Sequence, residues 1–269
     1  MTALSTGDQT RTTQAKSSRR ITARGGRKRS SRSRGTRAWN ALAVGLAVVW
    51  AFPVYWMVNS AFLPYNKIRA VDPTFVPLGG TLENFGNVFN GGFFSALRVS
   101  AIVTAITVVA ALLFAFVAAL AVSRFRFRGR KSFILAVLLI QMIPAEGLFI
   151  SQYKLLEGWH LLNTAVGLSL LYVAAVVPFT IWMLRGFVTG VPRELEEAAL
   201  VDGCSRTQAF FRVTFPLLAP GLVASGVYAF LQAWNEFTLA LVIMSRPESQ
   251  TLPVWLRTFT EANRATDWG

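Results

Sequence analysis

The sequence is poor in the residues that build covalent cross-links, metal sites and nucleotide pockets. It has one cysteine, Cys204, so a disulfide within the chain is impossible. Its one histidine, His160, cannot make a metal site by itself. No phosphate-binding loop of the form GxxxxGK followed by Ser or Thr occurs. If the protein uses ATP, another chain must hydrolyse it.

Acidic residues are also scarce, and those within apolar segments lack the partners of an enzyme site. The 269 residues include 13 Asp and Glu against 27 Lys and Arg, which gives a formal net charge of +14. The two carboxylates within apolar segments, Glu146 and Glu236, have no His or metal-ligand cluster near them in the sequence. We therefore expect no catalytic residues, no metal and no cofactor in this chain.

What the sequence has in abundance is apolar length. It is 53% hydrophobic with a mean hydropathy of +0.45, values that water-soluble domains do not usually combine with so high a charge. A membrane span needs about 20 mostly apolar residues, and lipid leaves helices as the way to satisfy the backbone of a single chain segment. We predict an all-α, polytopic membrane helical bundle in domain 38–269. Its five predicted spans are 39–60, 96–123, 132–152, 164–188 and 217–245.

The basic residues predict the orientation of this bundle. Residues 1–37 hold eleven Lys and Arg against one acidic residue, and the loop 124–131 holds five more. Because basic flanks stay in the cytoplasm, the amino terminus, this loop and the stretch 189–216 are predicted to be cytoplasmic. The tail 1–37 has almost no apolar content and is predicted to be disordered. We interpret it as an anchor on anionic membrane lipid and disfavour a role in nucleic-acid binding.

The stretch 189–216 carries helix signals between two spans. Pro192 and the acidic residues after it suit a helix start, and Gly203 suits a left-handed helix end. Ser205 with Gln208 matches a capping box. A second helix is expected from Arg206 to Val213, interrupted by Pro216 before the last span. Leu195, Ala198, Ala199 and Asp202 share one face of the first helix. Two interpretations remain open, an interfacial connector resting on lipid headgroups and a docking element for a cytoplasmic partner.

The same stretch resembles a family motif. Glu197-Ala198-Ala199, three residues, Gly203, nine residues and Val213-Thr214-Phe215-Pro216 is similar to the EAA loop of ABC importer permeases. The family has Ile and Leu where this chain has Val213 and Phe215, which remain apolar. The resemblance implies that this loop, called the coupling segment below (residues 189–216), docks on an ABC ATPase. The coupling residues that it implies are Glu197, Ala198, Ala199, Asp202, Gly203 and Pro216.

In particular the chain resembles the carbohydrate-uptake, maltose-type permeases over roughly residues 45–269. The resemblance includes Trp234-Asn235-Glu236-Phe237, the Asn84-Phe85 region and Thr251-Leu252-Pro253-Val254. It implies an ATP-driven sugar importer with a second related permease, an ABC ATPase dimer that binds ATP and Mg, and an extracellular solute-binding protein. The external loop 246–269, with Thr251, Leu252 and Pro253, is then expected to face the binding protein. The alternative for this loop is a surface helix with Trp255 and Phe259 at the headgroups.

The sugar path is expected among polar residues inside the spans, since such residues usually face an interior or a water-filled space. Aromatic rings could stack on a sugar, and an alternative role for each polar residue is interhelical hydrogen bonding. Asn235 and Glu236 are the foremost candidates because they lie in a matched motif. The candidates are Asn235, Glu236, Gln232, Gln141, Trp234 and Tyr228, with Asn59, Glu146 and Tyr172 as further possibilities.

Two further expectations concern the whole protein. Maltose-type permeases have a sixth span, which is expected beyond residue 269. Arg outnumbers Lys by 22 to 5, which suggests a GC-rich bacterium and a multi-pass protein of the bacterial cell membrane. The alternatives left open are an ABC permease for a polyamine, phosphate or amino acid and, less favoured, a secondary transporter or membrane scaffold.

Overall fold

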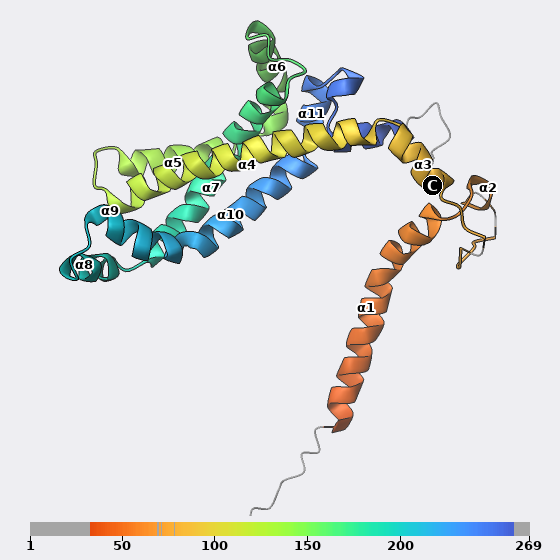
Figure 1. Cartoon of the computed structure of the whole chain (residues 1–269), viewed down its shortest axis with the longest axis horizontal. Coiled ribbons are helices and arrows are strands. Elements are labelled where there is room, and N and C mark those ends of the chain that lie inside the picture. Colours follow the sequence, from red (N-terminus) through yellow and green to blue (C-terminus); the bar gives the residue numbers. More distant parts are fainter. Residues whose placement is uncertain (1–32, 69, 71, 78, 261–269) are drawn as a thin grey trace, which may run out of the picture. The chain divides into compact units, whose positions relative to one another are not determined.

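The computed structural model describes residues 33–260 apart from 69, 71 and 78, and in this part of the chain every regular element is a helix (Figure 1). The predicted all-α class is confirmed. The chain divides into two compact units, Met1–Tyr55 and Trp56–Gly269. The helices are α1 (Ser33–Ala61), α2 (Tyr65–Ile68), α3 (Glu83–Asn90), α4 (Phe93–Arg124), α5 (Arg130–Ile140), α6 (Phe149–Gly158), α7 (Ala165–Gly190), α8 (Arg193–Val201), α9 (Arg206–Ala209), α10 (Phe215–Asn235), α11 (Thr238–Ile243) and α12 (Leu252–Leu256).

The first unit contains most of α1, which is long and apolar enough to cross a membrane. From Trp39 to Ala61 its mean hydropathy is 2.0, and Pro53 lies inside it without ending it. The basic tail 1–37, predicted to be disordered, lies outside the described residues as far as residue 32. Residues 33–37 belong to α1, so the helix begins earlier than the predicted span.

In the second unit, two asparagines hold the connection that leads from the end of α1 to α4. The Asn59 side chain is buried and donates from Nδ2 to the carbonyl oxygen of Thr74 at 2.7 Å. The Nδ2 of Asn84 donates to the carbonyl oxygens of Ala61 at 3.1 Å and Leu63 at 2.9 Å. Asn59, a further possibility for the sugar path, therefore serves the packing of this connection.

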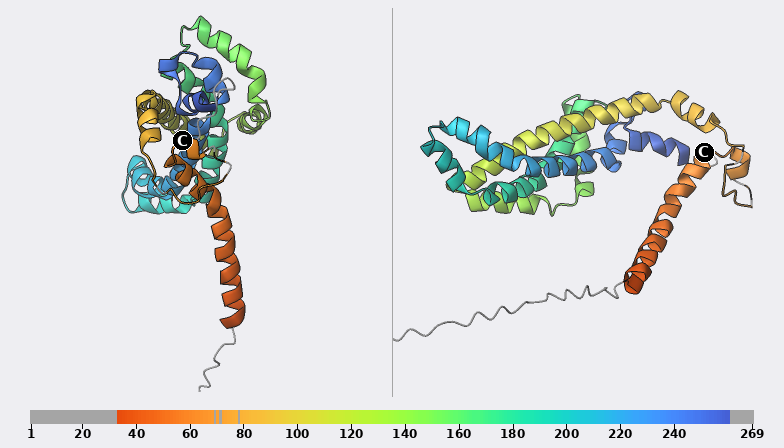
Figure 2. Two further views of the ribbon diagram at one scale, coloured as in Figure 1. Left: turned by 90° about the vertical axis from the view of Figure 1, so that its right-hand side faces the viewer. Right: turned by 60° about the horizontal axis from the view of Figure 1, so that its bottom comes forward.

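The core of the second unit is formed by α4, α7 and α10, which run side by side in every view (Figures 1 and 2). Small residues at four-residue spacing line two of these helices. Such stripes let helix backbones approach closely, which is how membrane helices gain packing energy without a hydrophobic effect between them. The buried small residues are Ala111, Ala115 and Ala119 on α4, and Gly221, Ser225, Ala229 and Ala233 on α10.

Larger side chains of α7 pack against these stripes. Ile181, Leu184 and Val188 form one buried cluster with Ala115 and Ala119 of α4. Their volumes fill the space that the alanines leave, as close packing of a protein interior requires. The alternation of small and large residues thus fixes how the three helices fit together.

Two predicted spans are broken in the structure. The segment 132–152 forms α5 and then a 3₁₀ turn, η1 (Ala145–Leu148), with α6, and the two parts are bent by 91°. Pro144 lies directly before η1. The helix breaks there because the proline ring disfavours a helical residue before it and proline has no N–H for a helical hydrogen bond. The segment 217–245 likewise breaks between α10 and α11. Among the described residues there are four candidate spans, or five if the bent pair counts as one.

The close contact of α10 with α7 at Gly221 generates a stability prediction. A Cβ atom at Gly221 would lie 2.5 Å from Cγ of Phe187 on α7. We expect Gly221→Ala to lower the free energy of unfolding by about 1–3 kcal/mol, the usual cost of overpacking, and so to lower the thermal unfolding temperature in detergent. Gly226→Ala, on the same helix, is the control because its Cβ would lie 3.4 Å from Leu112. Equal unfolding temperatures for both variants would contradict the prediction.

Candidate functional site

The coupling segment contains a helix, α8, that starts and stops through local signals. Pro192 is extended at the position before α8, and Glu194 and Glu196 lie in the first turn. At the other end Gly203 has φ +87°. The N–H of Gly203 donates to the carbonyl of Leu200 at 3.1 Å, and the N–H of Cys204 donates to that of Ala199 at 3.0 Å. This pair of bonds is a Schellman motif, so the predicted left-handed end at Gly203 is confirmed.

The chain then turns directly into the next helix. The N–H of Ser205 donates to Gln208 Oε1 at 2.9 Å, and the N–H of Gln208 donates to Ser205 Oγ at 3.3 Å. The predicted capping box is therefore confirmed. Only Gly203 and Cys204 lie between Asp202, the residue that follows α8, and Ser205, which caps α9. The turn is therefore short and its backbone has little conformational freedom.

The predicted interruption at Pro216 is wrong. After α9 the backbone passes through a π-helix, η2 (Phe210–Thr214), straight into α10, and the helical run from Arg206 to Asn235 is long enough to span a membrane. Pro216 lies in the first turn of α10, and the N–H of Phe215 donates to the carbonyl of Phe210. The wider π turn places the proline where its missing N–H is tolerated without a break.

The predicted face of α8 is divided between two environments. Ala199 is buried, α8 contacts η2, and the buried Thr214 of η2 donates its hydroxyl to Glu196 Oε2 at 3.4 Å. Leu195 and Val201 are 43% and 88% exposed. Glu197, Ala198 and Asp202 are exposed as well. One side of α8 therefore contacts the start of α10, and the other side is open and partly apolar.

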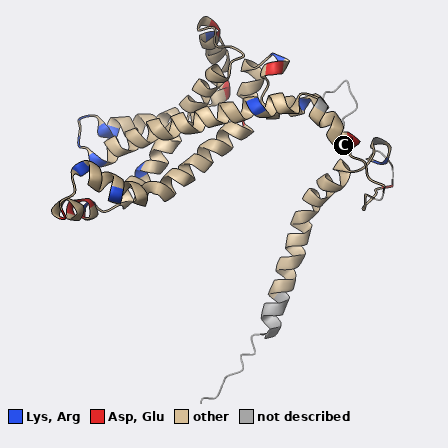
Figure 3. Ribbon diagram, in the orientation of Figure 1, with Lys and Arg blue, Asp and Glu red and all other residues tan. Residues whose placement is uncertain are grey.

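A basic loop lies at the same end of the bundle as the coupling segment. Nη2 of Arg193 donates to the carbonyl of Arg124 at 3.0 Å, and Nη2 of Arg124 donates to the carbonyl of Val191 at 3.4 Å. Figure 3 shows Lys and Arg gathered at this end beside the acidic α8. The end of α4, the loop that follows it and the coupling segment thus form one continuous surface.

Glu236 occupies the break between α10 and α11, where its carboxylate is fully engaged. Oε2 accepts the hydroxyl of Tyr172 at 2.6 Å and the N–H of Ala240 at 3.0 Å, while Oε1 accepts the N–H of Leu239 at 2.7 Å. Tyr172, a possible sugar-stacking ring in the sequence, is buried. Glu236 therefore caps the first turn of α11, and its hydrogen bond with Tyr172 connects this turn to α7.

Three other predicted path residues share one face of α10. Tyr228, Gln232 and Asn235 follow each other at intervals of four and three residues, which places them on one side of a helix. Gln232 and Asn235 are exposed, and Asn235 Nδ2 donates to its own helix at the carbonyl of Leu231, 2.9 Å away. The ring of Tyr228 lies 4.5 Å from that of Phe179 on α7. This polar face (Tyr228, Gln232 and Asn235) is an exposed hydrogen-bonding strip beside aromatic rings.

The remaining path candidates are not part of this face. Gln141 follows α5 and is exposed, and Glu146 is exposed in η1. Trp234 stacks on Phe230 within α10 at 5.4 Å. Six residues separate Trp234 from Tyr228, so the two rings point to different sides of the helix. Of the six residues first named as path candidates, the structure thus brings three together on one face.

The segment after α11 folds back onto the start of α4. Thr251 is 4% exposed, and the N–H of Leu252 donates to Ser100 Oγ at 2.7 Å. Trp255 is 6% exposed and donates from Nε1 to the carbonyl of Gly91 at 2.8 Å. The alternative that placed Trp255 at the headgroups is wrong, because its indole N–H has a partner inside the fold. Leu252 and Pro253 stay partly exposed, and residues 261–269 of the predicted loop lie outside the described residues.

The sequence analysis missed Asn163, which joins two loops. Its backbone has φ +58°, a conformation that Asn tolerates better than most residues. Its Oδ1 accepts the N–H of Arg246 at 3.0 Å and the hydroxyls of Ser245 at 3.2 Å and Ser249 at 3.3 Å. An Asn between Leu162 and a helix-capping Thr164 was the available signal, but its partners lie more than 80 residues away.

Comparison with known proteins identifies the family. Residues 111–263 match the family described as "Binding-protein-dependent transport system inner membrane component". The chain belongs to this family, whose members are transport subunits of ABC importers. The match covers the coupling segment, the polar face and Glu236. The permease class suggested by the EAA-like motif is thereby confirmed.

Individual relatives extend the match over most of the chain. It is 44% identical to the diacetylchitobiose uptake system permease protein DasC of Streptomyces coelicolor, over 87% of this chain and 85% of that one. It is 34% identical to the trehalose transport system permease protein SugB of Mycobacterium tuberculosis, over 84% and 81%. A chain of a bacterial ABC transporter involved in alginate import has the same fold, with a TM-score of 0.73, 23% identity and coverage of 87% and 84%.

Proposed function

We propose that this chain is the permease subunit of a sugar or oligosaccharide importer and forms half of the translocation path. The observation that carries the proposal is the capped α8–turn–α9 unit, which has the EAA-like residues and an open outer side. The names of the relatives, which cite diacetylchitobiose and trehalose, support a sugar as the solute. In this proposal a second permease completes the path, a separate ABC ATPase dimer hydrolyses ATP, and an extracellular binding protein delivers the sugar.

The coupling segment is proposed to dock on the ATPase with the exposed side of α8. Glu197, Ala198, Val201 and Asp202 lie open on α8, so a partner could grip this helix without unfolding it. The buried Ala199 and the contact of α8 with η2 hold the helix against the start of α10. A displacement of α8 is then passed to α10 as a rigid-body motion. Because basic residues lie at this end of the bundle, we place it and the amino terminus in the cytoplasm.

The translocation path is proposed to run along the polar face of α10. The amide groups of Gln232 and Asn235 are exposed and can hydrogen bond to sugar hydroxyls, while Tyr228 offers a ring. Exposed amides within an apolar helix are unfavourable in lipid, so we infer that the second permease covers this face and leaves a polar space between the two. Glu236 positions this face by holding the helix break just after Asn235. Gln141 and Trp234 remain weaker candidates.

The segment after α11 is proposed to contact the binding protein on the opposite side of the membrane. Leu252 and Pro253 are partly exposed and available for contact. The burial of Thr251 gives this residue a role in shaping the segment. The hydrogen bonds from Leu252 to Ser100 and from Trp255 to Gly91 connect a contact made in this segment to the start of α4.

The proposed assembly predicts which proteins accompany this chain. Mild-detergent purification of the tagged full-length protein from its own host should recover a second permease, an ABC ATPase and a solute-binding protein, identified by mass spectrometry. The recovered binding protein can then be titrated with sugars, and we expect at least one to bind. Recovery of the chain without an ATPase in several detergents would contradict the proposal. A binding protein that takes amino acids, phosphate or polyamines instead would contradict only the sugar assignment.

The coupling proposal predicts transport loss without loss of insertion. Gly203→Val forces a β-branched residue to φ +87°, a conformation that costs such residues about 1–2 kcal/mol or more, and Glu197→Lys reverses a charge on the open side of α8. Both variants should insert normally but show reduced uptake of the identified sugar per molecule of ATP hydrolysed. Gly190→Val is the control, because a Cβ there meets open space without a positive φ. Uptake at the unaltered level in Gly203→Val would overturn the proposed coupling role.

The path proposal predicts different effects for two neighbouring residues. Asn235→Leu should keep the thermal unfolding temperature but reduce sugar uptake, because the residue is exposed and bonds only within its own helix turn. Glu236→Gln should lower the unfolding temperature, since a buried donor that loses its carboxylate partner costs about 1–3 kcal/mol. Thermal unfolding and uptake measured on both variants test this. Full uptake in Asn235→Leu would remove Asn235 from the path.

A further inference from the structure

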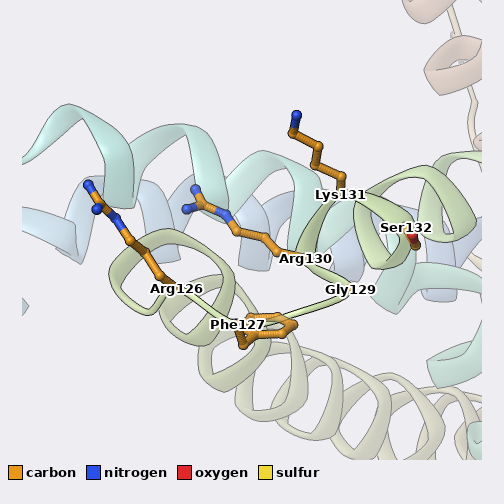
Figure 4. Close-up of a pocket in the computed structure, with 6 residues that line it drawn as sticks. All are labelled: Arg126, Phe127, Gly129, Arg130, Lys131 and Ser132. Carbon is orange, nitrogen blue, oxygen red and sulfur yellow. The ribbon is translucent and has the colours of Figure 1, made fainter.

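The loop between α4 and α5 forms a basic depression that neither coupling nor translocation explains. Its volume is about 340 Å³, at the small end of the range for ligand pockets. Three of its six lining residues are cationic, one is a serine and none is acidic (Figure 4). The lining residues are Arg126, Phe127, Gly129, Arg130, Lys131 and Ser132.

The three cationic side chains of this depression extend to the same side of the loop, and one loop arginine is not part of the lining. In Figure 4 the side chains of Arg126, Arg130 and Lys131 extend to one side of the loop, and Phe127 lies on the other. Arg128 belongs to the same loop but is not part of the lining. Three cations on one side of a short loop repel one another, and a bound anionic group relieves this repulsion. The depression therefore suits a compact anion such as a phosphate group.

Exposed apolar side chains lie in the same loop as the depression and along α5. Phe125 and Phe127 are 66% and 46% exposed within the basic loop. On α5, Phe133, Leu135 and Leu138 are exposed as well. Basic heads beside aromatic rings are typical of the membrane interface. A ligand that uses both surfaces has an anionic head and apolar tails.

We propose that this depression binds the phosphate headgroup of an anionic phospholipid whose acyl chains lie along α5. The proposal rests on the orientation given above, in which this loop meets the cytoplasmic leaflet, where basic pockets between spans bind anionic lipid headgroups. The exposed apolar side chains of the loop and of α5 favour a lipid over a free phosphate.

The test is a lipid titration of the delipidated full-length chain in dodecyl maltoside, followed by native mass spectrometry. Phosphatidylglycerol should bind in preference to phosphatidylcholine, and inorganic phosphate at equal concentration should not displace it. Arg126→Gln and Arg130→Gln should each weaken phosphatidylglycerol binding about fivefold, the contribution of one basic residue near an anionic surface. Arg128→Gln is the matched control, since it removes one charge from the same loop but lies outside the lining, and it should leave binding nearly unchanged.

Each other outcome overturns the proposal in a recognisable way. An equal loss in Arg128→Gln would mean diffuse attraction by the loop charge without a defined site. Displacement by inorganic phosphate would indicate a soluble-anion site. Binding that none of the three variants changes would place the lipid elsewhere, and would free the depression for an acidic surface of a partner protein. None of these readouts requires ATP, sugar or partner subunits, so their failure is separate from a failure of the proposed transport function.

Discussion

The constraint on which this structure depends is that lipid offers no hydrogen-bond partners to a polypeptide backbone. Every place where a helix stops within the bundle must therefore supply its own partners. The break between α10 and α11 does so with one carboxylate: Glu236 accepts two backbone N–H groups of α11 and the Tyr172 hydroxyl. The π turn at η2 solves the same problem at Pro216 by shifting the hydrogen-bond register without opening the helix.

The second constraint is that apolar surface alone does not hold helices together in lipid, because the tails are equally apolar. In the second unit, complementary shapes of the packed side chains hold the helices together. Small residues every four positions on α4 and α10 face larger residues of α7, and at Gly221 there is no room for even a methyl group. This close packing is consistent with the proposed coupling, in which the three helices move together.

Local patterns were predictable from the sequence, and long-range partners were not. The helical class, the left-handed Gly203 and the capping box at Ser205 follow from short-range chemistry, and all three are confirmed. The break at Pro144 was signalled by the proline, yet hydropathy alone favoured a single span over 132–152. The Tyr172 partner of Glu236 and the side-chain partners of Asn163 lie some 64 to 86 residues away, and spacing within one helix carries no information about them. The polar face of α10 was predictable in part. Helical periodicity groups Tyr228, Gln232 and Asn235 on one side of the helix, but it does not show that the candidate Gln141 lies apart from them.

Helix α10 connects the coupling segment with the polar face formed by Tyr228, Gln232 and Asn235. This helix begins at η2, which contacts α8 and donates a hydrogen bond from Thr214 to Glu196, and it ends at Asn235, one residue before the carboxylate that caps α11. Between these points, its small-residue stripe is locked against α4 and α7. In the proposed coupling, a tilt of α8 is carried along α10 to Gln232 and Asn235. The same proposal gives a function to the Schellman turn and the capping box at one end of this path and to the partly buried carboxylate of Glu236 at the other, because each fixes the backbone where a flexible loop would absorb the motion.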